Sequence, residues 1–263
     1  MSEDREGRSD RDGEDARDAS DPVARFAVPL ERVTRVASAV VVVVFALLVA
    51  SAITGPTARL AVSAGLVAEG TSAWQVLRTV VQFGGFLLAV VGYLAFTDEW
   101  DVVDVARPSR IDTALVVGGA VGLLALQYGA LLVLAEVGLT TGENRATVAA
   151  GDPVPYYLAM IAVSLLVVGP IEELLFRGVV QGGLRRAFDA GPAILIASLV
   201  FGVIHLPSIE GALPEQLAYV GVVVLLGCVL GLLYERTGNV VVPGLAHGAY
   251  NAAIYAVLLA GVL

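Results

Sequence analysis

The chain of 263 residues is 57% hydrophobic and has a mean hydropathy of +0.81, while only 16% of its residues are charged. A soluble domain carries roughly 25% charged residues, so the composition excludes an ordinary soluble protein and indicates a membrane protein. The net charge of −9 is unevenly distributed, because residues 1–25 hold nine acids and five arginines with almost no apolar side chains.

The N-terminal segment, residues 1–30, is predicted to be a disordered acidic tail on the cytoplasmic side. Low hydrophobicity with dense charge leaves too little apolar surface to stabilise a fold. The segment does not resemble a secretory signal, because no short apolar region directly follows a basic start. Residues 31–263 are expected to form one transmembrane domain, since the apolar residues fall in long runs.

Seven apolar runs approach the roughly 20 residues that a membrane-spanning helix needs. The stretch 60–69 is too short to cross and is expected to be interfacial or re-entrant; if it crosses, the number of spans becomes eight. The predicted fold class is therefore an all-α polytopic membrane protein with seven or eight transmembrane helices. The runs lie near residues 36–54, 79–96, 113–135, 157–176, 191–206, 216–234 and 240–262.

The arginines predict the orientation in the cell membrane. Cytoplasmic segments carry an excess of Lys and Arg, which favours a cytoplasmic N-terminus and a C-terminus outside. In that orientation the outer segments carry only Arg59, Arg78 and Arg145. The inner segments carry Arg25, Arg32, Arg35, Arg107, Arg110, Arg185, Arg186 and Arg236.

Three charged residues interrupt the fourth apolar run, in the stretch VVGPIEELLFRGVVQGG. A charge at the centre of a membrane helix costs about 2.5–3.5 kcal/mol on insertion scales, so Glu172, Glu173 and Arg177 need partners. Glu173 and Arg177 are spaced i,i+4 with the acid first, which favours an ion pair along one helix face. Such an ion pair can stabilise the structure without taking part in a reaction. Both residues are therefore expected to support the site rather than to react.

Glu172 points about 100° away from Glu173 and therefore requires another partner. The chain has two histidines, His205 and His247, and both lie in later apolar runs. Counted along the helices at 1.5 Å per residue, Glu172 and His205 both come out roughly 20 Å from the inner face, with His247 somewhat shallower. The sequence therefore predicts a polar cluster in a cavity between helices.

Phe201 precedes His205, and Asn251 follows His247, at the i,i+4 spacing that places both side chains on one helix face. Phe201 is expected to pack against His205 and hold it in position. Asn251 either joins the polar cluster or bridges two helices, which is a common role of Asn in membranes. Intramembrane ionisable groups are functional candidates by default, although a lone His can also simply bond helices together.

This cluster contains the groups that peptide hydrolysis requires. Glu172, paired with a His, can hold and deprotonate a water molecule that attacks a peptide carbonyl. His247 and the Asn251 amide can donate hydrogen bonds to the developing oxyanion. A nucleophile beside a His is not apparent, because Ser198 lies seven residues before His205 and Cys228 lies in another run.

A metal version of the chemistry uses the same residues. Glu172, His205 and His247 match the two-His, one-Glu ligand set of several hydrolytic zinc sites, which leaves a fourth position for water. The sequence lacks an HExxH motif, so no motif independently supports zinc. We favour the metal-free version, because the glutamate, the two histidines and Asn251 already provide the base and the oxyanion donors.

Three motifs occur on separate apolar helices: EExxxR at 172–177, FxxxH at 201–205 and HxxxN at 247–251. Together they resemble those of the CAAX-processing and bacteriocin-processing (CPBP) family of intramembrane proteases, which includes the type II CAAX prenyl endopeptidases. The resemblance covers roughly residues 115–262 and implies an all-helical fold with a conical cavity open toward the cytosol. By this resemblance, Glu172 and His205 activate water, His247 and Asn251 stabilise the oxyanion, and Glu173, Arg177 and Phe201 support the site.

The resemblance implies an intramembrane endopeptidase whose partners are the lipid bilayer and a peptide or protein substrate, with no nucleic acid. It leaves open whether the substrate is prenylated, and whether the mechanism uses zinc or the glutamate alone. Two alternatives remain: a non-catalytic scaffold or immunity protein of the same fold, and a proton-coupled transporter. Pro170, Pro207 and Pro243 could break transporter helices, but no internal repeat is visible.

Overall fold

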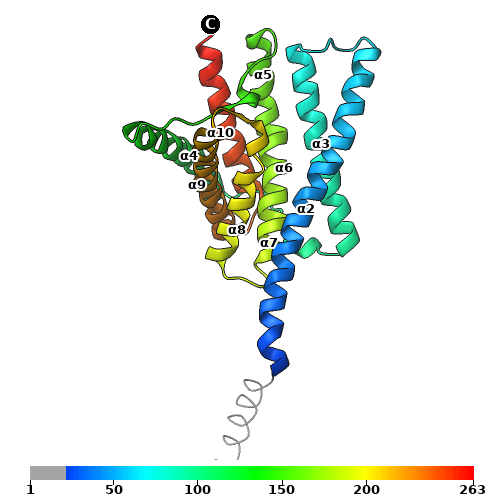
Figure 1. Cartoon of the computed structure of the whole chain (residues 1–263), viewed down its shortest axis with the longest axis vertical. Coiled ribbons are helices and arrows are strands. Elements are labelled where there is room, and N and C mark those ends of the chain that lie inside the picture. Colours follow the sequence, from blue (N-terminus) through cyan, green and yellow to red (C-terminus); the bar gives the residue numbers. More distant parts are fainter. Residues whose placement is uncertain (1–21) are drawn as a thin grey trace, which may run out of the picture.

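The computed structural model describes the backbone of residues 22–263 and the side chains from Leu30 onward. Of the predicted acidic tail, residues 1–21 lie outside this range, and the first described helix begins at Pro22. The α-helices of the described residues are labelled in Figure 1. They are α2 (Pro22–Ser63), α3 (Ser72–Thr97), α4 (Arg110–Glu136), α5 (Pro153–Val163), α6 (Gly169–Glu173), α7 (Gly182–Leu184), α8 (Ala190–Val203), α9 (Leu213–Thr237) and α10 (Val241–Ala260).

Within the described residues, seven helical spans are long and apolar enough to cross a membrane, which confirms the all-α polytopic fold class. The fourth span, Pro153–Leu184, joins α5, α6 and α7 through two π-helical turns at Ser164–Val168 and Leu174–Gln181. Three short 3₁₀ turns lie between helices, at Trp100–Val102, Arg145–Thr147 and Leu206–Ser208. Two strands of two residues each, β1 (Glu143–Asn144) and β2 (Ile209–Glu210), pair antiparallel.

The stretch 60–69 does not form a separate span. The α2 helix continues through Gly55 and Pro56 to Ser63, so the first part of this stretch is simply the end of the first span. The chain then turns and begins α3 at Ser72. Residues 60–63 are therefore not a re-entrant piece, and the described residues contain no eighth span.

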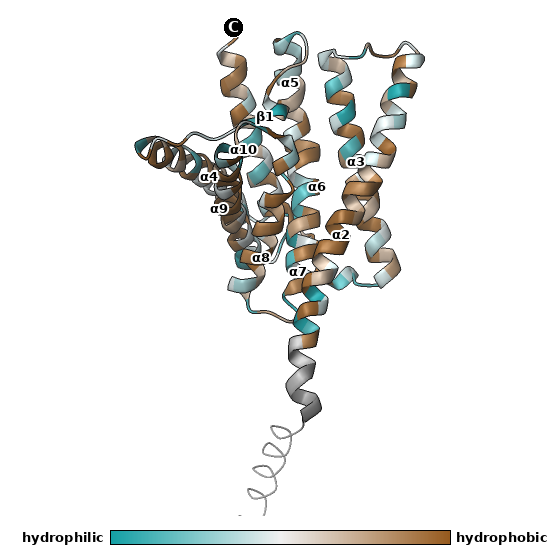
Figure 2. Ribbon diagram, in the orientation of Figure 1, coloured by the Kyte–Doolittle hydropathy of each residue, from teal (hydrophilic) through white to brown (hydrophobic). Residues whose placement is uncertain are grey.

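The helices form a bundle around α10. In Figure 1, α2 and α3 make a hairpin beside the α5–α7 span, whereas α4 lies at the opposite edge against α9 and α10, with its C-terminal end projecting outward. The α10 helix packs against α4, α5, α6 and α9. Figure 2 shows that hydrophobic residues predominate along most of the helices, and many large apolar side chains are exposed on the bundle surface, as lipid contact requires. Exposed Leu48, Leu132 and Leu166 are examples.

Glycines allow α6 and α10 to approach backbone to backbone. A Cβ added to Gly169 would lie 2.5 Å from both the Gly244 oxygen and the Gly248 nitrogen, which is too close for non-bonded atoms. Small residues at i,i+4 spacing, such as Gly244 and Gly248, commonly mark such contacts between membrane helices. The close approach places the carboxylates that follow Gly169 beside His247.

Candidate active site

A chain of ionisable side chains crosses from α6 to α10. The predicted ion pair between Glu173 and Arg177 is present, with Nε and Oε2 2.8 Å apart and both side chains fully buried. The other Glu173 oxygen lies 2.9 Å from His247 Nδ1. His247 Nε2 then lies 3.7 Å from Glu172 Oε2. His247 therefore lies between two adjacent glutamates, one of which Arg177 already neutralises.

The two glutamates differ in their surroundings, as their 100° separation predicts. Glu173 is completely buried, whereas 13% of the Glu172 side chain is exposed. Both lie in the short α6, between the π-helical turns that begin at Ser164 and Leu174. Wide turns of this kind occur frequently at functional sites, where they re-aim side chains. Glu172 is therefore the carboxylate that faces the cavity, whereas Glu173 is buried and contacts Arg177 and His247.

His205 presents one free ring nitrogen. Its Nδ1 lies 2.7 Å from the backbone oxygen of Phe201, and a carbonyl oxygen can only accept, so Nδ1 carries the hydrogen. In the neutral ring, Nε2 is then an acceptor. Phe201 lies edge-on to both histidines, with ring centroids 4.8 Å from His205 and 5.9 Å from His247. As predicted, Phe201 packs against His205, and it also separates the two rings.

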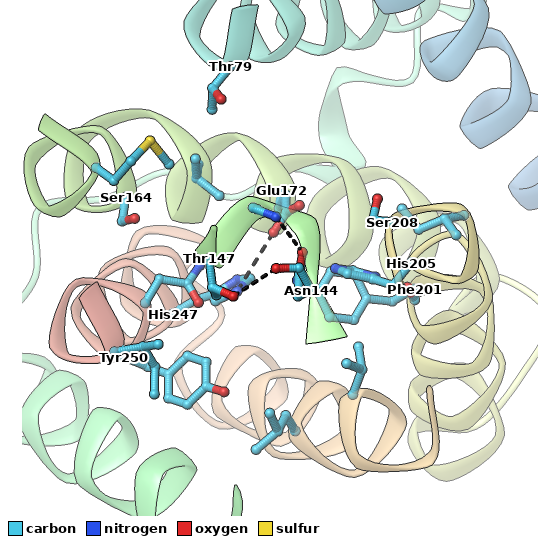
Figure 3. Close-up of a pocket in the computed structure, with 18 of the residues that line it drawn as sticks. Thr79, Asn144, Thr147, Ser164, Glu172, Phe201, His205, Ser208, His247 and Tyr250 are labelled. Carbon is cyan, nitrogen blue, oxygen red and sulfur yellow. Dashed lines mark hydrogen bonds and ion pairs between the residues drawn. The ribbon is translucent and has the colours of Figure 1, made fainter. Parts of the chain in front are cut away.

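A cavity of about 460 Å³ brings the predicted catalytic residues together. Figure 3 shows Glu172 and His247 facing one another, with Phe201 on the neighbouring α8 and His205 just after the end of that helix. Glu173 and Arg177 are not part of the cavity wall. The wall includes Glu172, Phe201, His205, His247 and Asn251. His205 was predicted on the helix of Phe201 but lies in the turn that follows α8, which ends at Val203; the others lie on the predicted helices.

The donor set does not form a three-ligand metal site. Among the residues that the structure describes, no three His, Cys, Asp or Glu side chains gather closely enough to hold a metal ion. Both histidines engage Nδ1, with Glu173 and with the Phe201 carbonyl, and keep Nε2 available, but His205 does not join Glu172 and His247 in a group close enough to share an ion. No catalytic step is therefore assigned to zinc. Zinc binding stays a prediction that metal analysis can test.

Several residues of the cavity carried no signal in the sequence. Asn144 donates from Nδ2 to the hydroxyl of Tyr219 at 2.8 Å, and the Tyr250 hydroxyl bonds the amide of Gln127. Asn144 belongs to the connection between α4 and α5, where no helical spacing predicts which side chains point inward. The buried hydroxyl of Ser164 has no hydrogen-bond partner among the described residues.

The cavity reaches one end of the bundle. Its wall includes residues 142–144 and 146–147 and Ser208, all in connections at the end opposite to the start of α2 (Figure 2). No residue of the described connections 98–109, 185–189 or 238–240, at the other end, belongs to the wall. A cytoplasmic N-terminus and a cavity open toward the cytosol therefore cannot both hold.

The fold and the cavity define a polytopic membrane protein with a buried cluster of glutamates and histidines. Residues 154–253, which contain all three motifs, match the family described as "Type II CAAX prenyl endopeptidase Rce1-like". The chain is also 34% identical over 113 residues to "Putative membrane peptidase YdiL" of Bacillus subtilis (strain 168). That match covers 43% of this chain and 42% of the relative's length.

No solved structure matches the chain with statistical significance. The two sequence comparisons confirm the predicted resemblance to the CPBP proteases.

Proposed function

We propose that the protein is an intramembrane endopeptidase in which Glu172 is the general base. The observation that carries the proposal is the chain from Arg177 through Glu173 and His247 to Glu172, because it ends in the one carboxylate of the pair that faces the cavity. A structural ion pair alone would need only Glu173 and Arg177. The further charged group at the cavity wall is costly to keep in a membrane and is expected to have a function.

Hydrolysis begins with a water molecule held between the Glu172 carboxylate and His205 Nε2. Glu172 takes a proton as the water oxygen bonds to the carbonyl carbon of the substrate. The carbonyl oxygen becomes an oxyanion, which accepts hydrogen bonds from His247 Nε2–H and from the Asn251 amide. His247 can keep its Nδ1–H on Glu173 throughout, so its orientation does not change during the reaction.

Collapse of the tetrahedral intermediate re-forms the carbonyl and breaks the peptide C–N bond. Glu172 gives its proton to the leaving amine and is ready for another water molecule. Glu173 and Arg177 never touch the substrate in this scheme. Their role is to hold the imidazole of His247 in place, as partners of a catalytic His commonly do.

The substrate is proposed to be a membrane-associated peptide or protein, with or without a prenyl group. The printed name of the matching family refers to prenylated substrates, and apolar residues such as Leu47, Phe83 and Phe86 extend the cavity wall away from Glu172. The arginine distribution favours a cytoplasmic N-terminus in the cell membrane. In that orientation the cavity reaches the outer face, opposite to the direction implied by the resemblance.

Cleavage of a peptide pool, with and without a prenylated C-terminal Cys, tests the proposal. The purified wild type should cleave members of the pool, Glu172→Gln should not, and Glu136→Gln should cleave normally, because Glu136 is exposed at the end of α4. Metal content measured on the same samples separates the zinc and glutamate mechanisms. Cleavage by Glu172→Gln at the wild-type rate would contradict the proposal and favour a scaffold or a transporter.

A further inference from the structure

The connection between α4 and α5 crosses the mouth of the cavity. We refer to residues 142–148 as the strap. Strand β1 of the strap pairs with β2, with Glu143 opposite Glu210 and Asn144 opposite Ile209. Figure 3 shows Asn144 beside the facing pair of Glu172 and His247. The strap therefore lies between the catalytic residues and the surface at this end of the bundle.

The two halves of the strap are held very differently. Its C-terminal half is anchored to buried tyrosines, because the hydroxyls of Tyr156 and Tyr255 both donate to the Ala146 oxygen, at 2.7 and 2.8 Å. Tyr157 donates to the Thr147 oxygen at 3.2 Å, and Gln75 donates to the Val148 oxygen at 2.8 Å. This half is fixed to helices α3, α5 and α10.

The N-terminal half of the strap is held by the short ladder and by polar side chains. Arg145 forms an ion pair with Glu210 at 2.8 Å, but both side chains are about 60% exposed, at 62% and 59%. Exposed ion pairs contribute little to stability. Three further hydrogen bonds hold this half: Gly142 N–H donates to the Glu215 oxygen at 3.0 Å, Arg145 donates to the Pro207 oxygen at 3.4 Å, and Asn144 donates to the Tyr219 hydroxyl. The half that covers the cavity is thus the half that can be displaced at least cost.

The position of β2 beside His205 would make replacement of β1 by a substrate peptide relevant to catalysis. β2 begins four residues after His205, and the intervening Ser208 is itself part of the cavity wall. An extended peptide carries the same backbone donors and acceptors as β1, and adding a strand to a free sheet edge is a recurring mode of peptide recognition. A peptide paired with β2 would run along the cavity beside His205.

From these contacts we infer that β2 is the edge on which an extended peptide substrate binds, and that β1 covers this edge until the substrate displaces it. That a substrate binds on β2 rests on the proposed peptidase function. The displacement of β1 can be measured without cleavage. The inference assigns part of the substrate affinity to backbone pairing, and it places substrate access at the end of the bundle opposite to the start of α2.

A disulfide across the ladder tests whether the strap must move. Residues directly opposite in an antiparallel pair have Cα atoms about 4.5–5.5 Å apart, which suits a disulfide. Glu143→Cys and Glu210→Cys would be combined in a Cys228→Ser background, because Cys228 is the only native cysteine. The oxidised protein should lose at least tenfold in cleavage rate, and reduction should restore it, while each single cysteine variant cleaves in both states. Equal cleavage by the oxidised and reduced forms would overturn the inference.

Thiol labelling tests the same movement when no cleaved peptide is known. Ser164→Cys in the Cys228→Ser background places a reporter on the buried cavity wall. Gly142→Ala should raise its labelling rate several-fold, because the new Cβ would lie 2.5 Å from Ile209 Cγ2 and would also collide with the Glu210 oxygen.

Arg145→Ala should also raise the labelling rate, whereas Arg59→Ala, another exposed arginine at this end, should not. Unchanged labelling in both strap variants would overturn the displacement. Absence of cleavage in every form, together with raised labelling in the strap variants, would instead contradict the proposed function and leave the displaceable strap standing.

Discussion

Two networks of arginines and acids among the described residues differ in burial. One lies inside the bundle, where Arg177 and Glu173 are fully buried. The other lies at the end of the bundle near the start of α2, where the Arg186 and Glu99 side chains remain 32% and 18% exposed. Both networks have close contacts, the shortest 2.7–2.8 Å. Distance therefore does not distinguish them, but access to water does.

Burial changes what each network can do. Removing one partner of a buried pair leaves an uncompensated charge, whereas an exposed pair is screened and contributes about 0–1 kcal/mol. The exposed network has further members, because Arg35 also pairs with Glu99 and Asp101 also pairs with Arg186, so water or a neighbour can replace a lost partner. The buried network contains one histidine that faces a cavity. The comparison indicates that the buried charges serve the site and the exposed ones serve the surface.

Arg177→Ala is the change with the largest expected effect. It leaves the Glu173 carboxylate buried without its cation, which should cost about 3–5 kcal/mol of unfolding free energy and abolish cleavage. Thermal unfolding in detergent measures the loss. A melting temperature equal to that of the wild type would show that the pair is not energetically coupled to the fold.

His247→Ala should reduce activity much more than stability. Loss of one oxyanion donor typically lowers kcat by about 10²–10³-fold. The Glu173–Arg177 pair remains in this variant, so the melting temperature should fall less than in Arg177→Ala. Peptide cleavage and unfolding measured on one preparation compare the two effects. A variant that unfolds as readily as Arg177→Ala would assign His247 a mainly structural role.

Arg186→Ala should have the smallest effect. Arg186 bonds both oxygens of Asp101, at 2.7 and 2.8 Å, but the Asp101 side chain is 75% exposed. The expected cost is below about 1 kcal/mol, and cleavage should be unchanged. The same unfolding and cleavage assays apply. A loss comparable to that of Arg177→Ala would remove the distinction between the two networks.

Spacing along single helices predicted much of the site. The i,i+4 rule predicted the Glu173–Arg177 ion pair and the contact between Phe201 and His205, because both depend only on local helical geometry. The run lengths likewise predicted seven spans, since bilayer thickness sets the length of each helix.

Contacts between helices were less predictable. The hydrogen bond between Glu173 and His247 depends on the close approach of α6 and α10 at Gly169, and the GxxxG spacing in α10 was the available signal for that approach. The strap could not be predicted either, because its position depends on hydroxyls such as that of Tyr156, which lie on helices elsewhere in the bundle. The wide turns around α6 leave no hydrophobic pattern of their own.

The central claim is that two adjacent glutamates have separate roles, with Glu172 performing chemistry and Glu173 holding the site. Cleavage and thermal unfolding of Glu172→Gln and Glu173→Gln, measured side by side, test this claim most directly. Glu172→Gln should be inactive yet as stable as the wild type, because Glu172 is not part of the buried ion pair. Glu173→Gln should lose both stability and activity, because Arg177 loses its counter-charge. Wild-type cleavage by Glu172→Gln, or an unchanged melting temperature in Glu173→Gln, would contradict the division of roles.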